Sequence, residues 1–338
     1  MRYFVTGSTG LIGSHVVTKL LEHGHEVVAL TRSRANADHL PEGATVVEGD
    51  ITEKESMRNS MKGVDGVFHI AAWFYVGPGP GNVEKAEQIN VTGTRNVLEL
   101  MDELAIQKGV YTSTIGVYPL RELEYIDETI APRCPESAVY YRTKWEAHYE
   151  VAKPMIDDGL SLVVVQPGIV YGPGDKVYGS IRGLFRGYLQ GEIPMIPRVH
   201  YAPWDHVGDI ADGHVRAMEQ GTPGETYIIS GPSREIVDVL RCAENITGIP
   251  VPRIVSPKVI GGVAKLMGAV ERFVTPPEGL EAETLRFLAG PQWPVDNSKA
   301  TEELGIVHRP LENGLRDYLE WEMDQLGIQG EGLAVAQR

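Results

Sequence analysis

The sequence predicts an α/β fold, a doubly wound parallel sheet with a smaller C-terminal cap. Three observations support this prediction. Short apolar runs rich in Val and Ile alternate with longer helical patterns over the first half of the chain. A glycine-rich turn joins the first apolar run to the first helical pattern. After about residue 170 the pattern changes to shorter elements that Gly- and Pro-containing turns separate.

The apolar runs of the first half are candidate strands. They cover residues 3–6, 26–30, 45–48, 66–71, 110–113 and 162–166. Because these runs lack the polar alternation of a half-exposed sheet, we expect strands that are buried on both faces of a parallel sheet. Helical patterns lie between the runs, for example at 13–22 and at 84–104, where apolar residues recur with a helical period.

The change near residue 170 separates the predicted sheet from the predicted cap. We expect a sheet domain of residues 1–170, with returning segments at about 205–230, and a cap of residues 171–204 and 231–325. Two such units suit a chain of 338 residues, since a domain typically takes roughly 150 residues. Residues 327–338 are predicted to form a flexible tail.

Composition and charge exclude several classes of function. The chain has 31 Lys and Arg against 46 Asp and Glu, and the resulting net charge of −15 disfavours binding to nucleic acid or to an anionic membrane surface. No run of about 18 apolar residues and no signal-peptide pattern occurs, so we expect a cytoplasmic protein. With two cysteines, Cys134 and Cys242, a disulfide framework and a four-cysteine zinc site are excluded.

The ten histidines do not predict a metal site. His206 and His214 are eight positions apart, which is not a typical ligand spacing. His23 and His25 lie at the end of a predicted helix without a third ligand nearby. We therefore predict that the protein binds no metal.

Residues 6–13 follow the first predicted strand and open the first helix, with glycines at Gly7, Gly10 and Gly13. Three glycines at this spacing arise often by chance, so their position between a strand and a helix carries the prediction. Glycine lets backbone amides approach a pyrophosphate, and the helix N-terminus offers unpaired N–H groups. We predict a dinucleotide-binding loop; the alternative is a tight turn without a ligand.

The end of the second predicted strand bears on which nicotinamide cofactor binds. An acidic side chain there binds the ribose of NAD, whereas an arginine accommodates the 2′-phosphate of NADP. Here Arg32 and Arg34 follow the strand, and no acidic residue appears before Asp38. We therefore predict NADP(H) in preference to NAD(H); the alternative is that both arginines are solvated loop charges.

Tyr140 and Lys144 are four residues apart, so one face of a helix carries both. A lysine ammonium beside a phenol lowers the phenol pKa from its usual value of about 10, which lets the phenol exchange a proton with a carbonyl oxygen. Tyr149 and Lys153 share the spacing, but Tyr149 lies on the opposite side of the helix. Pro154 is also expected to stop or kink that helix. Tyr140 is therefore the better candidate.

Hydroxyl side chains at Thr112, Ser113 and Thr114 end the fifth predicted strand. Ligands bind at the carboxyl edge of an open α/β sheet, where a hydroxyl can hydrogen-bond a reacting oxygen. Threonine is also an ordinary strand residue, so these hydroxyls alone do not decide a function.

The glycine loop, the hydroxyl-bearing strand end and the Tyr140/Lys144 pair, in this order, resemble the extended short-chain dehydrogenase/reductase family, within the NAD(P)-dependent epimerase/dehydratase superfamily. The resemblance runs from residue 2 to about 323 and includes motifs at 50–51, 69–72, 90–94, 166–174, 206–211 and 296–300. It implies a Rossmann fold with Thr114, Tyr140 and Lys144 as catalytic residues, Thr114 rather than Ser113 taking the hydroxyl position. It also implies a homodimer that packs the helices at 84–104 and 137–151 against a partner.

The resemblance also assigns residues to a cofactor and to a substrate. The expected cofactor contacts are Gly7, Thr9, Gly10, Leu11, Ile12, Gly13, Arg32, Arg34, Asp50, Ile51, Ala71, Ala72, Tyr140, Lys144, Pro167, Gly168 and Val170. The expected substrate contacts are Trp73, Tyr75, Ser113, Thr114 and Tyr178.

Departures from the family pattern narrow the expected reaction. Sugar dehydratases carry acidic residues directly after the catalytic threonine, whereas Ile115 and Gly116 follow it here. Ala202 stands where sugar-nucleotide epimerases usually carry an arginine that binds the diphosphate. The aromatic segment 73–76 suits a flat or apolar substrate, although ordinary packing under a loop would also explain it.

With these departures, the chain resembles the dihydroflavonol-reductase-like branch of the family. We predict an oxidoreductase that reduces a ketone or an aldehyde with NADPH. In this reaction Tyr140 donates the proton, Thr114 orients the oxygen, and Lys144 binds the nicotinamide ribose and lowers the pKa of Tyr140. A nucleotide-sugar epimerase or dehydrogenase is the alternative. A non-catalytic NADP-sensing protein is a third candidate, although such proteins generally lack the tyrosine–lysine pair.

Overall fold

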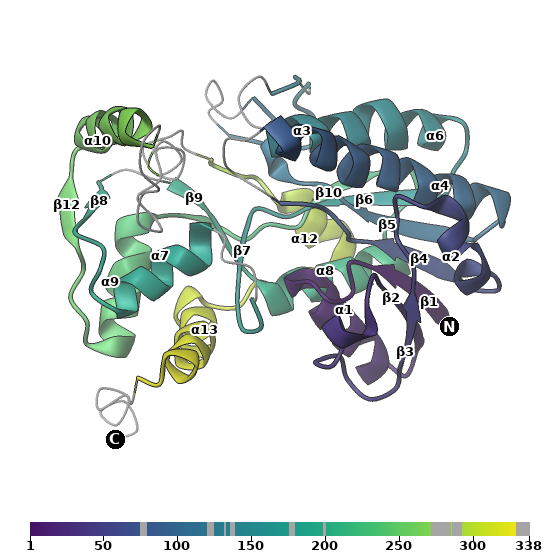
Figure 1. Cartoon of the computed structure of the whole chain (residues 1–338), viewed down its shortest axis with the longest axis horizontal. Helices are drawn as coiled ribbons and strands as arrows, with labels where there is room; N and C mark the ends of the chain where they lie inside the picture. Colours follow the sequence, from purple (N-terminus) through teal and green to yellow (C-terminus); the bar gives the residue numbers. More distant parts are fainter. Residues whose placement is uncertain are drawn as a thin grey trace.

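The computed structural model describes residues 1–74, 80–119, 125–131, 133–135, 139–175, 180–198, 201–271, 285 and 293–328. Its main element is a seven-stranded parallel sheet with the strand order β10-β6-β5-β4-β1-β2-β3 (Figure 1). The strands are β1 (Arg2–Thr6), β2 (Glu26–Thr31), β3 (Ala44–Glu48), β4 (Gly66–His69), β5 (Lys108–Thr112), β6 (Leu162–Gln166) and β10 (Thr226–Ile228). The predicted strands are all present. β10 was not predicted because three residues are too few to form a recognisable pattern.

Alternate residues of β1, β2, β4, β5 and β6 enter two separate apolar cores. On β1, Tyr3 and Val5 belong to one core and Phe4 to the other. The first face is covered by α1 (Leu11–Glu22), α8 (Val207–Glu219) and α12 (Ser298–Leu304), and the second by α2 (Lys54–Met61), α4 (Gly93–Glu103) and the helical residues around Val151. Burial on both faces explains the unbroken apolar runs and confirms the doubly wound α/β fold.

Two long helices on the second face each contain a π-helical segment. α3 (Pro80–Ala86) continues through Glu87–Thr92 into α4. α5 (Val139–Trp145) continues through Glu146–Ala152 into α6 (Lys153–Asp157). The second helix does not stop at Pro154, because the proline falls in the first turn of α6, where its missing N–H group removes no regular α-helical hydrogen bond.

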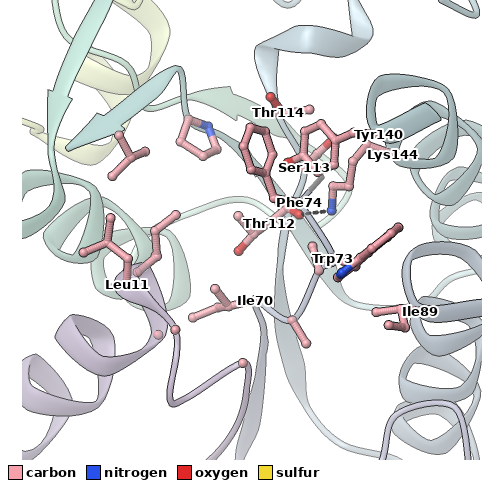
Figure 2. A pocket seen from close by; sticks show the side chains of 18 of the residues that line it. Leu11, Ile70, Trp73, Phe74, Ile89, Thr112, Ser113, Thr114, Tyr140 and Lys144 are labelled. Carbon is pink, nitrogen blue, oxygen red and sulfur yellow. Dashed lines mark hydrogen bonds between the residues drawn. The ribbon is translucent and has the colours of Figure 1, made fainter. Parts of the chain in front are cut away.

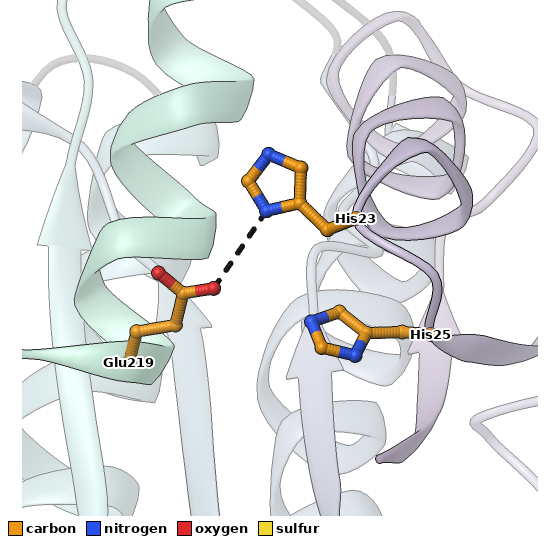
Figure 3. A group of neighbouring side chains, drawn as sticks. All are labelled: His23, His25 and Glu219. Atoms are coloured by element: carbon orange, nitrogen blue, oxygen red, sulfur yellow. Dashed lines mark ion pairs between the residues drawn. The ribbon is translucent and has the colours of Figure 1, made fainter.

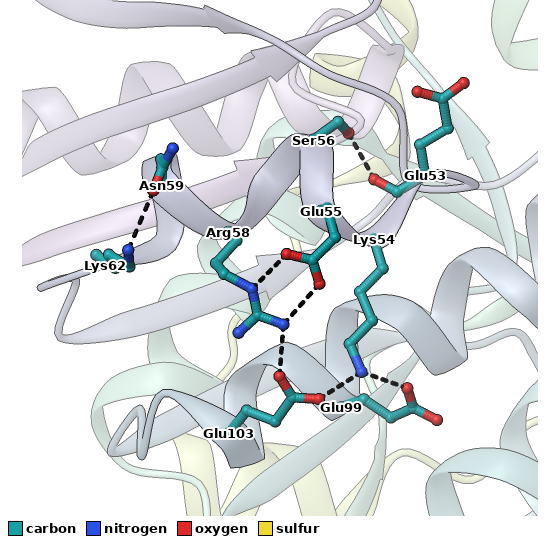
Figure 4. Close-up of polar contacts among 9 residues, drawn as sticks. All are labelled: Glu53, Lys54, Glu55, Ser56, Arg58, Asn59, Lys62, Glu99 and Glu103. Atoms are coloured by element: carbon teal, nitrogen blue, oxygen red, sulfur yellow. Dashed lines mark hydrogen bonds and ion pairs between the residues drawn. The ribbon is translucent and has the colours of Figure 1, made fainter.

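Ion pairs connect α2 to α4 at the surface of this layer (Figure 4). Lys54 Nζ lies 2.6 Å from the Glu99 carboxylate and 2.5 Å from that of Glu103. Arg58 bonds Glu103 at 2.7 Å and Glu55 at 2.6 Å. Solvent screens these exposed pairs, so the apolar contact between the two helices contributes more to stability than the ion pairs do.

The cap contains two small sheets and its own core. One sheet has the order β11 (Ser233–Glu235), β9 (Tyr201–His206), β7 (Ile169–Tyr171), and the other pairs β12 (Arg253–Val255) with β8 (Met195–Pro197). The cap helices are α7 (Ser180–Leu189), α9 (Ile236–Thr247), α10 (Pro257–Val270) and α13 (Leu311–Leu326). Aromatic and aliphatic side chains of α7, α9 and α13 form the main cap core with β9.

A buried group of charges joins α7 to α13. The Glu322 carboxylate is fully buried and accepts hydrogen bonds from Arg182 Nε at 3.0 Å and Arg186 Nη1 at 2.9 Å. Most of the predicted tail, 327–338, lies outside the described residues. Within the described part of the chain, no helix is both long enough and apolar enough to cross a membrane.

Candidate active site

A cleft with a volume of about 660 Å³ opens at the carboxyl ends of β1, β2, β4, β5 and β6 (Figure 2). Every expected cofactor contact except Arg34 lines this cleft, as do the expected substrate contacts Trp73, Ser113 and Thr114. Tyr75 and Tyr178 lie outside the described residues. Phe74, from the aromatic segment 73–76, lines the cleft as well. The lining also includes residues outside the expected contacts: Leu30, Thr31, Gly49, Ile70, Ile89, Thr112, Tyr141, Ile169, Asp175, Ile181 and Trp293.

The glycine loop is packed too tightly for side chains. Gly7 has a φ of +68°, and a Cβ atom there would lie 2.6 Å from the backbone nitrogen of Ala71. A Cβ atom on Gly13 would lie 2.0 Å from the carbonyl oxygen of Gly7. Gly10 caps α1 without a side-chain hydrogen bond, so the first N–H groups of the helix stay free for an anion. The loop therefore has the form that a pyrophosphate requires.

Gly13→Ala is expected to destabilise the fold by about 1–3 kcal/mol or more. The reason is that the backbone of Gly7, which cannot rotate away as a side chain can, occupies the space that the new Cβ atom needs. Urea unfolding without a cofactor measures this loss. Gly261→Ala is the matched control, since Gly261 lies in α10 with no atom near its added Cβ. Helix propensity predicts that this control is neutral or stabilising by up to about 1 kcal/mol. An equal effect of the two substitutions would contradict the packing argument.

The two arginines after β2 have different positions. Arg32 is exposed and lines the cleft. Arg34 lies in the short helical turn Arg34–Asn36, where its backbone N–H donates to Glu48 Oε1 at 3.1 Å, and it is not part of the cleft lining. Of the two candidates for a 2′-phosphate contact, Arg32 is therefore the better placed.

Lys144 is buried at the bottom of the cleft, with only 2% of its surface exposed. Its Nζ donates to the carbonyl oxygen of Thr112 at 2.7 Å and to Tyr111 Oη at 3.1 Å. It also lies 4.6 Å from the centre of the Tyr111 ring. Burial lowers the pKa of Lys144 to about 7, so its charge changes near neutral pH.

Tyr140 lines the same part of the cleft, with its ring edge-to-face against Phe74 at 4.8 Å and Tyr141 at 5.4 Å. Burial raises the pKa of its phenol. This direction is opposite to the one expected from the sequence, because the Lys144 ammonium bonds to Tyr111 and Thr112. Because burial disfavours the phenolate, Tyr140 is a protonated phenol at neutral pH.

Tyr149 lies outside the cleft, as its position on the helix predicted. Its ring stacks on His148 with a centroid distance of 4.1 Å. His148 in turn hydrogen-bonds Ser113 Oγ at 3.1 Å. The neighbouring Thr114 hydroxyl accepts a hydrogen bond from Gly116 N at 3.1 Å, which leaves its proton available for another acceptor.

Part of the cleft lining is apolar and aromatic. Trp73, Phe74, Tyr141 and Trp293 form this part, and Figure 2 shows Trp73 and Phe74 beside the Tyr140/Lys144 pair. Asn90 fixes this segment, since its side chain accepts from Trp73 N at 2.7 Å and donates to Trp73 O at 3.2 Å. Trp293 comes from a distant part of the chain, so no local sequence signal indicated it.

The comparison with protein families decides which family this arrangement represents. Residues 3–230 match the model described as the NAD dependent epimerase/dehydratase family, which is more than half of the chain. The chain belongs to this family. The match contains the glycine loop, the strand-end hydroxyls, the Tyr140/Lys144 pair and Ala202.

Several known proteins are similar to this one over nearly the whole chain. Sterol demethylase protein B of Methylococcus capsulatus is 27% identical over 337 residues, covering 95% of this chain and 98% of that protein. A Synechocystis protein provisionally named dihydroflavonol 4-reductase is 28% identical over 330 residues, covering 94% of each. The crystal structure of gox2253 superimposes with a TM-score of 0.81 at 28% identity, covering 97% and 99% of the two chains.

An NAD(P) nucleotide is the cofactor of this family, and the cleft fits it. The glycine loop and the open N-terminus of α1 would hold the pyrophosphate. Asp50, whose Oδ1 accepts hydrogen bonds from the backbone and hydroxyl of Thr52 at 2.9 Å, lies on the side of the cleft where Arg32 lies. Lys144 and Tyr140 lie at the other end, beside Trp73 and Phe74.

Proposed function

We propose that this protein reduces the carbonyl group of a ketone or an aldehyde with NADPH. The observation that carries the proposal is that the Tyr140 side chain lines a largely apolar cleft together with Thr114 and Lys144, because a reduction needs a proton donor beside the reacting oxygen. A nicotinamide held in the cleft would supply the hydride that a carbonyl carbon needs for reduction. Tyr140 gives its proton to the carbonyl oxygen, which completes the alcohol, and the phenolate is then reprotonated from solvent.

The neighbouring polar groups have separate roles in this proposal. The Thr114 hydroxyl donates a hydrogen bond to the carbonyl oxygen and sets its direction towards Tyr140. Lys144, which Thr112 O and Tyr111 hold in place, contributes a positive charge when the phenolate forms and binds the nicotinamide ribose. Because its pKa is about 7, this charge is fully available below neutral pH and is lost as the pH rises.

The walls of the cleft favour an apolar substrate over a sugar nucleotide. Trp73, Phe74 and Trp293 offer flat apolar surfaces. Ala202, at the position of the epimerase arginine, is fully buried on β9 and offers no charge for a diphosphate. We therefore propose a flat or largely apolar carbonyl compound.

A substrate panel tests the proposed reaction. The purified protein is mixed with aryl ketones, flavanonols and UDP-sugars while NADPH absorbance is followed. Loss of absorbance with the ketones or flavanonols is the expected result. Turnover with UDP-sugars alone would favour the epimerase or dehydrogenase alternative, and NADPH binding without any turnover would favour the sensing protein.

Arg32→Ser is expected to raise the KM for NADPH about 10- to 100-fold and to leave the KM for NADH nearly unchanged. The reason is the loss of a charged hydrogen bond to the 2′-phosphate, worth about 1.5–3 kcal/mol. Steady-state kinetics with both cofactors measures the ratio. Arg34→Ser is the matched control and should change neither value, because Arg34 does not line the cleft. An equal rise in the KM for NADH would contradict the assignment of Arg32 to the 2′-phosphate.

We also propose a homodimer, on the family resemblance of the helices at 84–104 and 137–151. Residues 84–104 and 139–151, which are the described part of these segments, pack against each other on one face of the sheet. The expected mass in solution is twice that of the 37.1 kDa chain. A monomeric mass by light scattering would reject the dimer.

A further inference from the structure

We propose that His23, His25 and Glu219 bind one divalent transition-metal ion of the Zn²⁺ class. The ligand atoms of these three side chains all lie within 4.8 Å of one another. His23 Nδ1 is 3.7 Å from Glu219 Oε1, and Figure 3 shows the three side chains gathered around a common space. The sequence predicted no metal here because the third ligand, Glu219, is remote along the chain.

The fold brings the three residues together at the ends of three elements. His23 caps the C-terminus of α1, and Gly24 turns the chain with a φ of +77° so that His25 directly precedes β2. Glu219 is the last residue of α8, which packs beside α1 on the same face of the sheet. The group therefore lies at the amino end of β2, away from the cleft at the carboxyl ends.

The backbone and the neighbouring rings hold both histidines in position. His23 N donates to Lys19 O and His25 N donates to Leu20 O, each at 3.0 Å. The His25 ring is also half-buried and packs edge-to-face on Tyr3 with a centroid distance of 5.1 Å.

Two helix ends and one carboxylate attract a cation to this place, while the N-terminal ammonium, which acts on the His25 ring, opposes it. Helices α1 and α8 both end here, and the C-terminus of a helix carries a partial negative charge. Glu219 adds a full negative charge. A positive ion between the two helix ends would therefore be attracted by the backbone as well as by its ligands.

The ligand set points to zinc rather than to a hard cation. Two imidazoles and one carboxylate form the usual protein ligands of a zinc ion that keeps a water as its fourth ligand. Tetrahedral bonds of about 2.0–2.1 Å need ligand atoms roughly 3.3 Å apart. Exposed side chains such as His23 and Glu219 can close the remaining gap by small rotations.

Zinc titration of the full chain without a histidine tag, after treatment with a chelator, tests the site. Isothermal titration calorimetry with Zn²⁺ should show one equivalent bound at this site. Glu219→Gln should weaken that binding at least tenfold, and the double variant His23→Gln/His25→Gln should abolish it. Glu26→Gln is the matched control and should bind as the unaltered chain does, since Glu26 follows His25 but is not part of the group.

Two further measurements separate this site from adventitious binding by other histidines or cysteines. Saturating Zn²⁺ should raise the Tm of the unaltered chain by a few degrees and leave that of Glu219→Gln unchanged, because only a folded α1–α8 pair presents all three ligands. Co²⁺ in place of Zn²⁺ should give the visible absorption of a tetrahedral site, again absent in the double variant. Zinc binding that is the same in the unaltered chain and in the double variant, or no binding at all, would overturn the proposal.

Discussion

Tyr140→Phe is expected to lower turnover about 10²- to 10⁴-fold and to leave the Kd for NADPH unchanged. The substitution removes the only proton that this side chain can donate, and general acid catalysis contributes rate factors of that size. The aromatic contacts with Phe74 and Tyr141 stay in place, since they involve the ring and not the hydroxyl group. NADPH oxidation measures turnover, and a fluorescence titration measures cofactor binding.

Tyr149→Phe is the matched control for this experiment. Tyr149 lies on the same continuous helix and is also followed four residues later by a lysine, but it does not line the cleft. Turnover of this variant should stay within about twofold of the unaltered protein. Preserved reduction by Tyr140→Phe, or equal losses in both variants, would contradict the role of Tyr140 as the proton donor.

Glu322→Ala is expected to destabilise the protein by about 3–5 kcal/mol, the usual cost of removing one partner from a buried ion pair. The Glu322 carboxylate is fully buried between Arg182 and Arg186, and Arg182 is itself only 7% exposed. Without the carboxylate, α13 and α7 keep their apolar contacts, but Arg182 and Arg186 of α7 lose their ion pairs with α13. Urea unfolding followed by circular dichroism measures the loss.

Glu320→Ala provides the control for the loss of a helical glutamate. Glu320 lies on α13 as well, but its side chain is exposed. Its removal should change the free energy of unfolding by less than about 0.5 kcal/mol. If both variants lose the same stability, the ion pairs in the cap contribute little and the effect belongs to the helix as a whole.

The sequence predicted the sheet well because its strands are buried on both sides. Residues such as Val163, Val164 and Val165 on β6 face alternate cores, so no polar residue interrupts the run. The cap was predicted only in outline. Its small sheets contain strands of three residues, such as β8 and β12, and pairings between such short strands depend on distant parts of the chain.

The candidate site also has a part that the sequence predicted and a part that it did not. The glycine loop and the Tyr140/Lys144 pair depend on close spacing, so both were recognisable. Trp293 and Ile181 approach the cleft from remote segments and carried no signal. The environment of Tyr140 was also beyond the sequence, because spacing shows that Lys144 is near but not that Tyr111 and the Thr112 carbonyl take its hydrogen bonds.

Burial of Lys144 also affects the folding equilibrium. An unfolded lysine has a pKa of about 10.4, whereas burial lowers the pKa of Lys144 to about 7 in the folded chain. Between these two values the unfolded chain binds one more proton, so this residue makes the free energy of unfolding rise with pH. Below pH 7 its ammonium opposes folding in full, by an amount on the order of 4 kcal/mol. The group that assists the proposed chemistry is therefore a local source of instability, which the apolar cores on both faces of the sheet must outweigh.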